Sequence, residues 1–284
     1  MGRESFWKTD PTDELRVGDG FVLADRPTDA RIGFDGGKSD GAKALAEGAA
    51  ILNDLQERLY AAGIAGDRRR VLLVLQAMDT AGKGGIVSHV VGAVNPAGVH
   101  YKAFKKPTEE ELAHDFLWRV EREEPAAGQI GVFDRSHYED VLIGRVRKLA
   151  PDDEIERRYG AIVDYEKKLA FAGTTIVKVM LHISRDEQKA RLAERLDRPE
   201  KHWKYNPGDV DERLLWDHYQ EAYQVAFDRT STDYAPWYVV PADRKWYARL
   251  AVQHLLVQAL EGLDLGWPEA DFDVDVEKAR LAAS

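Results

Sequence analysis

Residues 71–75, VLLVL, form an unbroken apolar run of branched side chains that leads directly into the stretch 76–85, QAMDTAGKGG. A run without alternating polar residues is typical of a strand that is buried on both faces. Such strands belong to parallel sheets, whose connections place helices on both sides. The glycines that follow predict a tight turn into a helix. This unit therefore restricts the chain to an α/β fold around a parallel sheet.

The rest of the chain alternates apolar runs with segments of helical spacing. Strands are predicted at 71–75, 130–134, 174–183 and 237–240, and helices at 43–62, 85–94, 109–123, 151–170, 185–197, 211–227 and 245–260. Ser184, followed three residues later by Glu187, is a capping-box pattern that opens the helix at 185. Residues 1–42 are rich in Gly, Asp and Pro and are expected to form an irregular arm on a single domain of residues 43–284. This alternation predicts three layers, with helices on both faces of the sheet.

The stretch 76–85 resembles a phosphate-binding loop, whose pattern is G-x-x-x-x-G-K-[ST]. Gly82 and Lys83 match, whereas Ala77 replaces the first glycine and Gly84 replaces the hydroxyl residue. The order of buried strand, glycine turn and helix still predicts backbone N–H groups that point at an anion, with the lysine as a mobile positive charge. The phosphate loop is defined here as Ala81, Gly82, Lys83, Gly84 and Gly85.

The missing hydroxyl removes one oxygen ligand for Mg²⁺, an ion that binds oxygen donors in near-octahedral geometry. Asp79 lies inside the loop, and Asp134 ends the apolar strand at 130–134, where a Walker B carboxylate is expected. We therefore expect Asp79 and Asp134 to hold Mg²⁺ between them, with Mn²⁺ as an alternative ion. The competing interpretation of Asp79 is that it caps the helix after the loop.

Arg135 follows Asp134 directly, and an Asp-Arg pair at a strand end resembles the motif of thymidylate kinase-like enzymes, in which the arginine holds an acceptor phosphate. A planar guanidinium suits this role because it binds phosphate oxygens in a bidentate manner. The alternative is an ion pair between the two neighbours, although adjacent strand residues point to opposite faces. His137 is interpreted as a hydrogen-bonding loop histidine rather than a phosphorylated nucleophile.

The charge balance limits the partners. The formal net charge of −10 argues against a general nucleic-acid binder. No apolar run approaches the roughly 20 residues that cross a bilayer, so no membrane partner is expected. Cysteine is absent, which excludes disulfides, thiolate zinc sites and cysteine nucleophiles. We expect a cytoplasmic protein that concentrates positive charge locally if its substrate is a polyanion.

Residues 185–204 are such a concentration, with seven Lys or Arg and five acidic residues. Arg191, Arg195 and Arg198 are spaced by four and three residues, which predicts one shared helix face. An ordinary solvated helix face also fits this run, and the interspersed acids favour that alternative. The helical register of the arginines favours an anion-binding lid at about 185–210.

Five segments in order resemble the polyphosphate kinase 2 family, P-loop phosphotransferases that move phosphoryl groups between polyphosphate and nucleotides. They are MDTAGKGG, KKPTEEELAHDFLWR, VFDRSHYEDVL, RLAERLDRPEKHWKYNPGD and APWYVVPADRKWYARL. The family pattern itself has an aspartate in the loop and lacks the hydroxyl after the lysine, so both departures from Walker A become agreements. Members carry either Asp or Asn at the position of Asp134.

The resemblance implies a thymidylate kinase-like sheet with a helical lid, and it implies roles for individual residues. The catalytic residues would be Asp79, Lys83, Asp134 and Arg135. Polyphosphate would be bound by Arg191, Arg195, Arg198 and Lys201. The nucleotide would be cradled by Lys105, Asp115 and Arg119. The alternative for this stretch is an ordinary amphipathic helix, with Leu112, Phe116 and Leu117 expected in the core.

The activity implied is a reversible, Mg²⁺-dependent, in-line transfer between polyphosphate and AMP, ADP or both, with adenine and guanine nucleotides as candidate acceptors. The segment FDRSHYEDVL is most similar to members that phosphorylate AMP and continue to ADP. The family also implies a homo-oligomer, a dimer or a tetramer. Two alternatives remain open: an ATP-dependent nucleoside monophosphate kinase on the same scaffold, and a non-catalytic regulator that binds polyphosphate or nucleotide.

Overall fold

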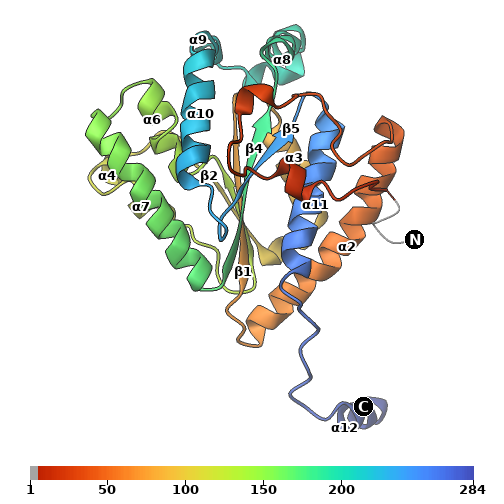
Figure 1. The fold of residues 1–284 in the computed structure, drawn as a ribbon. Helices are drawn as coiled ribbons and strands as arrows, with labels where there is room; N and C mark the ends of the chain where they lie inside the picture. Colours follow the sequence, from red (N-terminus) through yellow and green to blue (C-terminus); the bar gives the residue numbers. More distant parts are fainter. Residues whose placement is uncertain (1–5) are drawn as a thin grey trace.

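A five-stranded parallel sheet in the order β2-β3-β1-β4-β5 forms the centre of the computed structural model, which describes residues 6–284 (Figure 1). The strands are β1 (Arg70–Ala77), β2 (Val99–Ala103), β3 (Ile130–Asp134), β4 (Thr174–His182) and β5 (Trp237–Pro241). β1 lies between β3 and β4 and is buried along six of its residues, as the apolar run predicts. The predicted parallel α/β sheet is confirmed.

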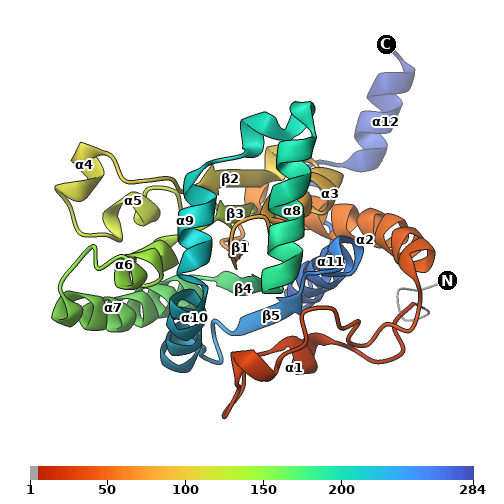
Figure 2. The same cartoon turned by 90° about the horizontal axis from the view of Figure 1, so that it is seen from above.

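Helices cover both faces of this sheet (Figures 1 and 2). One face carries α2 (Lys38–Ile64), α3 (Lys83–His89) and α11 (Lys245–Glu261), and the other carries α6 (Ile143–Val146), α7 (Asp152–Phe171) and α10 (Trp216–Thr230). The remaining helices are α1 (Thr12–Leu15), α4 (Glu109–Leu112), α5 (Trp118–Glu121), α8 (Arg185–Asp197), α9 (Gly208–Leu214) and α12 (Val274–Ala282). Short 3-10 turns are η2 (Leu23–Asp25), η3 (Val91–Ala93), η4 (Pro96–Gly98), η5 (His137–Asp140) and η6 (Pro199–Lys204).

The carboxyl ends of the strands meet at one edge of the sheet, and α8, η6 and α9 stand above that edge (Figures 1 and 2). This is where a helical lid is expected. In open α/β sheets ligands bind outside the carboxyl ends of the strands. The fold therefore places the phosphate loop after β1 and the Asp-Arg pair after β3 together, beneath the lid.

The N-terminal segment that the structure describes runs along the outer strand β5. The amide of Val17 donates to the carbonyl of Trp237 at 2.8 Å, and Arg16 forms an antiparallel bridge with Tyr238. α2 begins at Lys38 rather than at residue 43. The carboxylate of Asp40 accepts from the amide of Gly37 at 2.9 Å and opens the helix, in a small-residue stretch where apolar spacing gives no signal.

The single helix predicted at 109–123 is wrong. The chain forms α4 and α5 instead, because the side chain of Asp115 accepts from the amide of Leu117 at 3.1 Å and sets a turn between them. Leu112 is 69% exposed and is not a core residue, whereas Phe116 is buried as expected and Leu117 is half-buried.

Two further helices and one strand differ from the prediction. The helix predicted at 211–227 is divided at Leu215 into α9 and α10. The helix predicted at 85–94 begins earlier, at Lys83, and ends at His89. β2 was not predicted because it is a half-buried edge strand that contains His100 and Lys102.

Within the described residues, no helix combines the length and apolar character that a bilayer crossing requires.

Candidate active site

The phosphate loop turns sharply from β1 into α3. Gly82 is the residue before the helix and has a φ of 124°, a conformation that glycine adopts without steric cost. Lys83 begins the helix, and its Nζ lies 3.5 Å from the carbonyl of Ala77. The amide of Gly85 donates to the carbonyl of Gly82 at 2.8 Å. Gly85 therefore uses its N–H to close the first turn and does not direct it at an anion, contrary to the expectation.

Asp79 pairs with Arg135 across the sheet edge. An Oδ1 to Nη2 distance of 3.2 Å joins them, whereas the residue before α3 is Gly82 and no side chain caps that helix. The capping alternative for Asp79 is therefore wrong. Arg135 is not paired with its neighbour Asp134. Its backbone has left the strand with a φ of 64°, and its amide donates to the carbonyl of Leu75 at 2.9 Å.

Opposite charges surround the Arg135 guanidinium. Glu139 lies 3.8 Å away, and the attraction of Glu139, followed by that of Asp79, raises the pKa of Arg135 despite its burial. Burial raises the pKa of Glu139 although Arg135 and Lys83 oppose that shift. Sequence reasoning missed Glu139, and its only signal is its position four residues after Arg135.

A cleft of about 220 Å³ opens beside this cluster. Its lining includes Asp79, Arg135, Glu139, Asn206, Asp209, Tyr219 and Tyr223. These residues come from the loops after β1 and β3, from the lid and from α10. The cleft therefore lies between the segment that follows β1, the segment that follows β3 and the lid.

The carboxylates of Asp79 and Asp134 fit the chemistry of Mg²⁺. Asp134 is in register with Leu75 near the end of β1, and Asp79 follows that strand by two residues. The side chains of Asp79 and Asp134 therefore lie at the same edge of the sheet. Asp134 is half-buried, and among residues 6–284 its carboxylate accepts from the hydroxyl of Tyr101 alone, at 3.4 Å, which leaves oxygen lone pairs for a further partner. No group of three or more His or carboxylate side chains suited to a metal occurs within residues 6–284. An ion held by these two carboxylates would complete its shell with water and phosphate oxygens, as Mg²⁺ commonly does.

Arg191 is predicted to bind polyphosphate, but the structure gives its guanidinium other partners. It is 5% exposed, and five hydrogen bonds use all five N–H groups of its guanidinium. Two of these bonds reach the carbonyls of Thr80 and Ala81. Arg191 therefore holds the phosphate loop through its backbone and has no donor left for a phosphate.

The other three cations lie on the lid. Arg195 donates to the carbonyl of Lys204 at 2.9 Å and ties η6 to α8. Arg198 follows the last residue of α8 in an extended conformation and pairs with Glu194 and Glu200. The three arginines therefore do not share one helix face. Lys201 Nζ lies 3.7 Å from Glu194.

The three predicted nucleotide residues do not line the cleft. Arg119 is buried and donates to the carbonyl of Lys105 at 2.9 Å and to Asp140 at 3.4 Å, so it shapes its own loop. Asp115 forms an ion pair with Arg157 at 2.8 Å. The structure thus gives structural partners to Arg119 and Asp115, whereas Lys105 is exposed.

His137 is fully buried, and its Nε2 lies 3.2 Å from Glu166. The hydrogen-bonding interpretation of His137 is confirmed, and a buried ring of this kind is out of reach of a phosphate.

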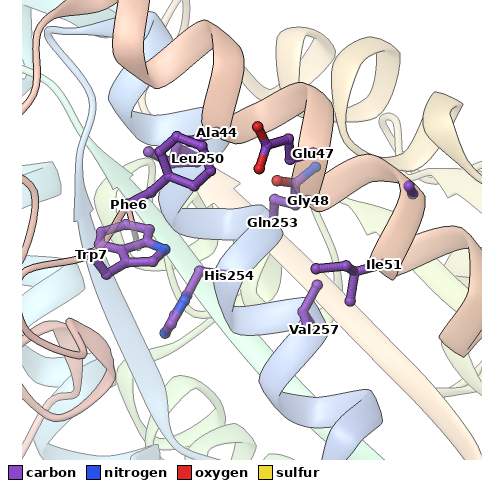
Figure 3. A pocket seen from close by; sticks show the side chains of 11 residues that line it. Phe6, Trp7, Ala44, Glu47, Gly48, Ile51, Leu250, Gln253, His254 and Val257 are labelled. Carbon is purple, nitrogen blue, oxygen red and sulfur yellow. The ribbon is translucent and has the colours of Figure 1, made fainter. Parts of the chain in front are cut away.

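A second hollow, of about 240 Å³, lies between the N-terminal segment, α2 and α11 (Figure 3). Phe6, Trp7 and Leu250 surround it, with Glu47 and Gln253 at one side. Among the described residues that line it there is no Lys or Arg and no member of the phosphate loop. This hollow is therefore unsuited to phosphates.

Comparison with known proteins agrees with this geometry. Residues 36–265 match the family Polyphosphate kinase 2 (PPK2). The AMP/ADP-polyphosphate phosphotransferase of Meiothermus ruber is 51% identical over 88% of this chain and 92% of its own length, and the ADP-polyphosphate phosphotransferase of Rhodopseudomonas palustris is 45% identical over 77% and 78%. The crystal structure of Polyphosphate Kinase 2 from Arthrobacter aurescens TC1 is 60% identical, has a TM-score of 0.96 and covers 98% of each chain. The chain belongs to the polyphosphate kinase 2 family.

Proposed function

We propose that this protein is a phosphotransferase that moves a phosphoryl group between inorganic polyphosphate and AMP or ADP, reversibly and in the presence of Mg²⁺. The observation that carries the proposal is the convergence of Lys83, Asp79 and Arg135 at one sheet edge, beside a cleft that lid residues help to line. The M. ruber relative, which is named for both AMP and ADP, supports the choice of acceptors.

Phosphoryl transfer depends on alignment and charge neutralisation more than on covalent chemistry. Lys83 and Arg135 would neutralise the reacting phosphate oxygens. Asp79 and Asp134 would hold Mg²⁺, which supplies further positive charge when bound. The attacking oxygen of AMP or ADP is already anionic, so no strong general base is needed. Arg195, Arg198 and Lys201 remain our proposed polyphosphate contacts on the lid, and Lys105 remains a proposed nucleotide contact.

The test is incubation of the purified protein with ADP, Mg²⁺ and polyphosphate, without ATP, followed by measurement of ATP. We expect ATP to form, and polyphosphate to shorten as it does. A panel of AMP, ADP, GMP and GDP with polyphosphate as sole donor then defines the acceptor. Product that forms only when ATP is supplied as donor would favour a nucleoside monophosphate kinase. Binding of polyphosphate without any change in its length would favour a regulator.

We further propose a cytoplasmic homo-oligomer, a dimer or a tetramer. Large exposed apolar side chains support self-association, among them Trp203 and Leu214 on the lid. Light scattering coupled to size-exclusion chromatography measures the mass directly. A mass of one chain at micromolar concentration would contradict this part of the proposal.

A further inference from the structure

Arg119 lies at a junction between the segment after β2 and the segment after β3. It belongs to α5, its side chain is 6% exposed, and its guanidinium reaches acceptors in both segments. Nη1 donates to the carbonyl of Lys105 at 2.9 Å, and Nη2 donates to the carboxylate of Asp140 at 3.4 Å. A buried guanidinium with planar donors can hold two loops in a fixed relative geometry.

The backbone that carries Lys105 is held from two sides. The amide of Phe104 donates to the carbonyl of Asp134 at 3.0 Å, which continues the pairing of β2 with β3. The Phe104 ring packs edge-on against Phe133 at 5.0 Å between centroids, and the Arg119 guanidinium lies 5.6 Å from the centroid of the Phe104 ring. The Lys105 side chain is exposed at the carboxyl edge of the sheet. A side chain acts at a defined place only when the residues around it hold its backbone, so Arg119 sets the point from which Lys105 extends.

Asp140 connects Arg119 to the charged cluster of the candidate active site. It is the last residue of η5 and directly follows Glu139, which lies 3.8 Å from Arg135. The Arg158 guanidinium of α7 donates to the carboxylate of Asp140 at 3.4 Å and to its backbone carbonyl at 3.1 Å. Burial raises the pKa of Asp140, and the attraction of Arg119 and then of Arg158 opposes that shift. The two arginines therefore stabilise the charged carboxylate and fix the end of η5.

We propose that Arg119 is a positioning residue for the nucleotide. It holds Lys105 in a fixed relation to the segment that carries Arg135, so that both cations reach the phosphates of one acceptor molecule. This inference rests on the proposed function, in which Lys105 contacts the nucleotide and Arg135 neutralises the reacting phosphate oxygens. It replaces the direct contact that the sequence predicts for Arg119, whose donors are directed at protein acceptors.

The first test measures KM for ADP and KM for polyphosphate in Arg119→Met, in Arg119→Lys and in the unchanged protein. We expect Arg119→Met to raise KM for ADP about tenfold, equivalent to ~1.4 kcal/mol, and to leave KM for polyphosphate unchanged. Arg119→Lys keeps a positive charge beside Asp140 but lacks the planar fork, so a partial recovery is expected. The matched control is Arg122→Met, which should change neither KM, because Arg122 directly follows the same helix and is exposed over the ring of Trp118.

A double-mutant cycle shows whether Arg119 acts through Lys105. Lys105→Met is combined with Arg119→Met, and the affinity of each folded variant for ADP is measured by calorimetric titration, with folding checked by circular dichroism. If Arg119 positions Lys105, each single variant binds ADP more weakly, and the double variant binds it no more weakly than Lys105→Met alone. A structural defect unrelated to Lys105 would add its own loss to that of Lys105→Met. The same cycle is built with Arg119→Lys if Arg119→Met does not fold.

The titration separates this inference from the proposed function, because ADP binding is measured without turnover. A protein that binds ADP but makes no ATP from ADP and polyphosphate contradicts the proposed function, while the cycle still decides the inference. Additive losses in the cycle would overturn the inference, and so would an unchanged affinity for ADP in either single variant. A rise in KM for polyphosphate alone would also overturn it, since Lys105 would then serve the phosphate donor.

Discussion

Arg191 and Lys83 act on the phosphate loop from different sides. Arg191 binds the backbone carbonyls of Thr80 and Ala81 and also those of Ala242 and Asp243 before α11. It therefore connects the loop to the base of the lid helix and to the loop after β5. Lys83, by contrast, has a single hydrogen bond within the described part of the chain, to the carbonyl of Ala77 at 3.5 Å, so its ammonium remains available for a phosphate.

Replacing Lys83 with Met should lower kcat by orders of magnitude while the protein stays folded. Lys83 is half-buried and has one long hydrogen bond, so its removal costs little packing. The charge that it brings to the transferred phosphoryl group has no substitute within the loop. ATP formation from ADP and polyphosphate measures the effect. A near-normal rate would reject the phosphate-loop assignment.

Replacing Arg191 with Met should destabilise the whole domain. The substitution leaves four backbone carbonyls and the carboxylate of Glu187 without their buried donors. We expect a loss of about 3 kcal/mol or more in the free energy of unfolding, measured in urea. Arg198→Met is the matched control directly after the same helix, because Arg198 is exposed and its ion pairs contribute little. Equal stability of the two variants would contradict the role given to Arg191.

His182 should make stability depend on pH. Burial lowers its pKa from 6.5 to about 4. Between these two values the unfolded chain binds a proton that the folded protein does not, so stability falls as the pH decreases from 6.5 towards 4. The shift corresponds to roughly 3 kcal/mol over that range. Unfolding curves for His182→Asn, measured at several pH values, should show a smaller slope in this window, whereas an identical slope would disprove the assignment.

Local sequence patterns predict the candidate catalytic residues but not the residues that support them. Asp79 and Lys83 follow from the loop pattern, and Asp134 and Arg135 follow from their position at a strand end. Arg191 and Arg195 are indistinguishable in the sequence, since both lie in helical register. Whether an arginine faces a carbonyl or solvent depends on the packing of α8 against distant segments. Arg249 lies in one of the five segments that resemble the family, but its proximity to Gly85 arises only when α11 packs beside α3.

At the scale of elements, a buried cluster of charged and polar side chains joins β4 and the segment after β3 to α7. Lys178 of β4 contacts Glu166 of α7 at 2.6 Å, and Tyr138 and His137 after β3 contact the same carboxylate at 2.8 and 3.2 Å. Lys178 also donates to the carbonyl of Thr230 at the end of α10. The attraction of Lys178 and His137 outweighs burial and lowers the pKa of Glu166. The cluster therefore fixes the segment that carries Arg135.

Replacing Glu166 with Gln should cost roughly 3–5 kcal/mol of stability, because Lys178 then remains buried without a counter-charge. The double change Glu166→Gln with Lys178→Met removes the uncompensated charge and should recover part of that loss. Chemical unfolding of the two single variants and the double variant gives the coupling energy. Additive effects would show that the two side chains act independently.

Element boundaries were predicted best where the signal is a continuous run. β3 and α8 match their predicted limits because an apolar run and a capping serine mark them: Ser184 accepts from the amide of Glu187 at 3.1 Å. The break between α4 and α5 depends on a turn that the side chain of Asp115 stabilises. β2 depends on its pairing with the buried strand β3. Neither leaves a periodic pattern in the sequence.

At the scale of the whole molecule, the sheet has one outer strand that is covered by the N-terminal segment. β5 is the last strand in the order of the sheet, and the bonds from Arg16 and Val17 occupy its free edge. Leu15 and Leu23 are buried in the same region. An uncovered edge strand is a template for pairing with another chain. The N-terminal segment therefore prevents another chain from pairing with the edge of β5, and it also covers part of the hydrophobic core.

Removal of residues 1–20 should expose the edge of β5 and the apolar surface beneath Leu15 and Val17. Burial of these two side chains alone contributes about 3–6 kcal/mol. We expect a lower free energy of unfolding and concentration-dependent aggregation, seen by light scattering. The matched control is removal of residues 267–284, which contain α12, a helix without buried residues that projects from the body (Figure 1). That truncation should leave the unfolding free energy of the domain unchanged. If the N-terminal truncation stays as stable and as soluble as this control, the edge of β5 is protected by something other than the segment at Arg16 and Val17.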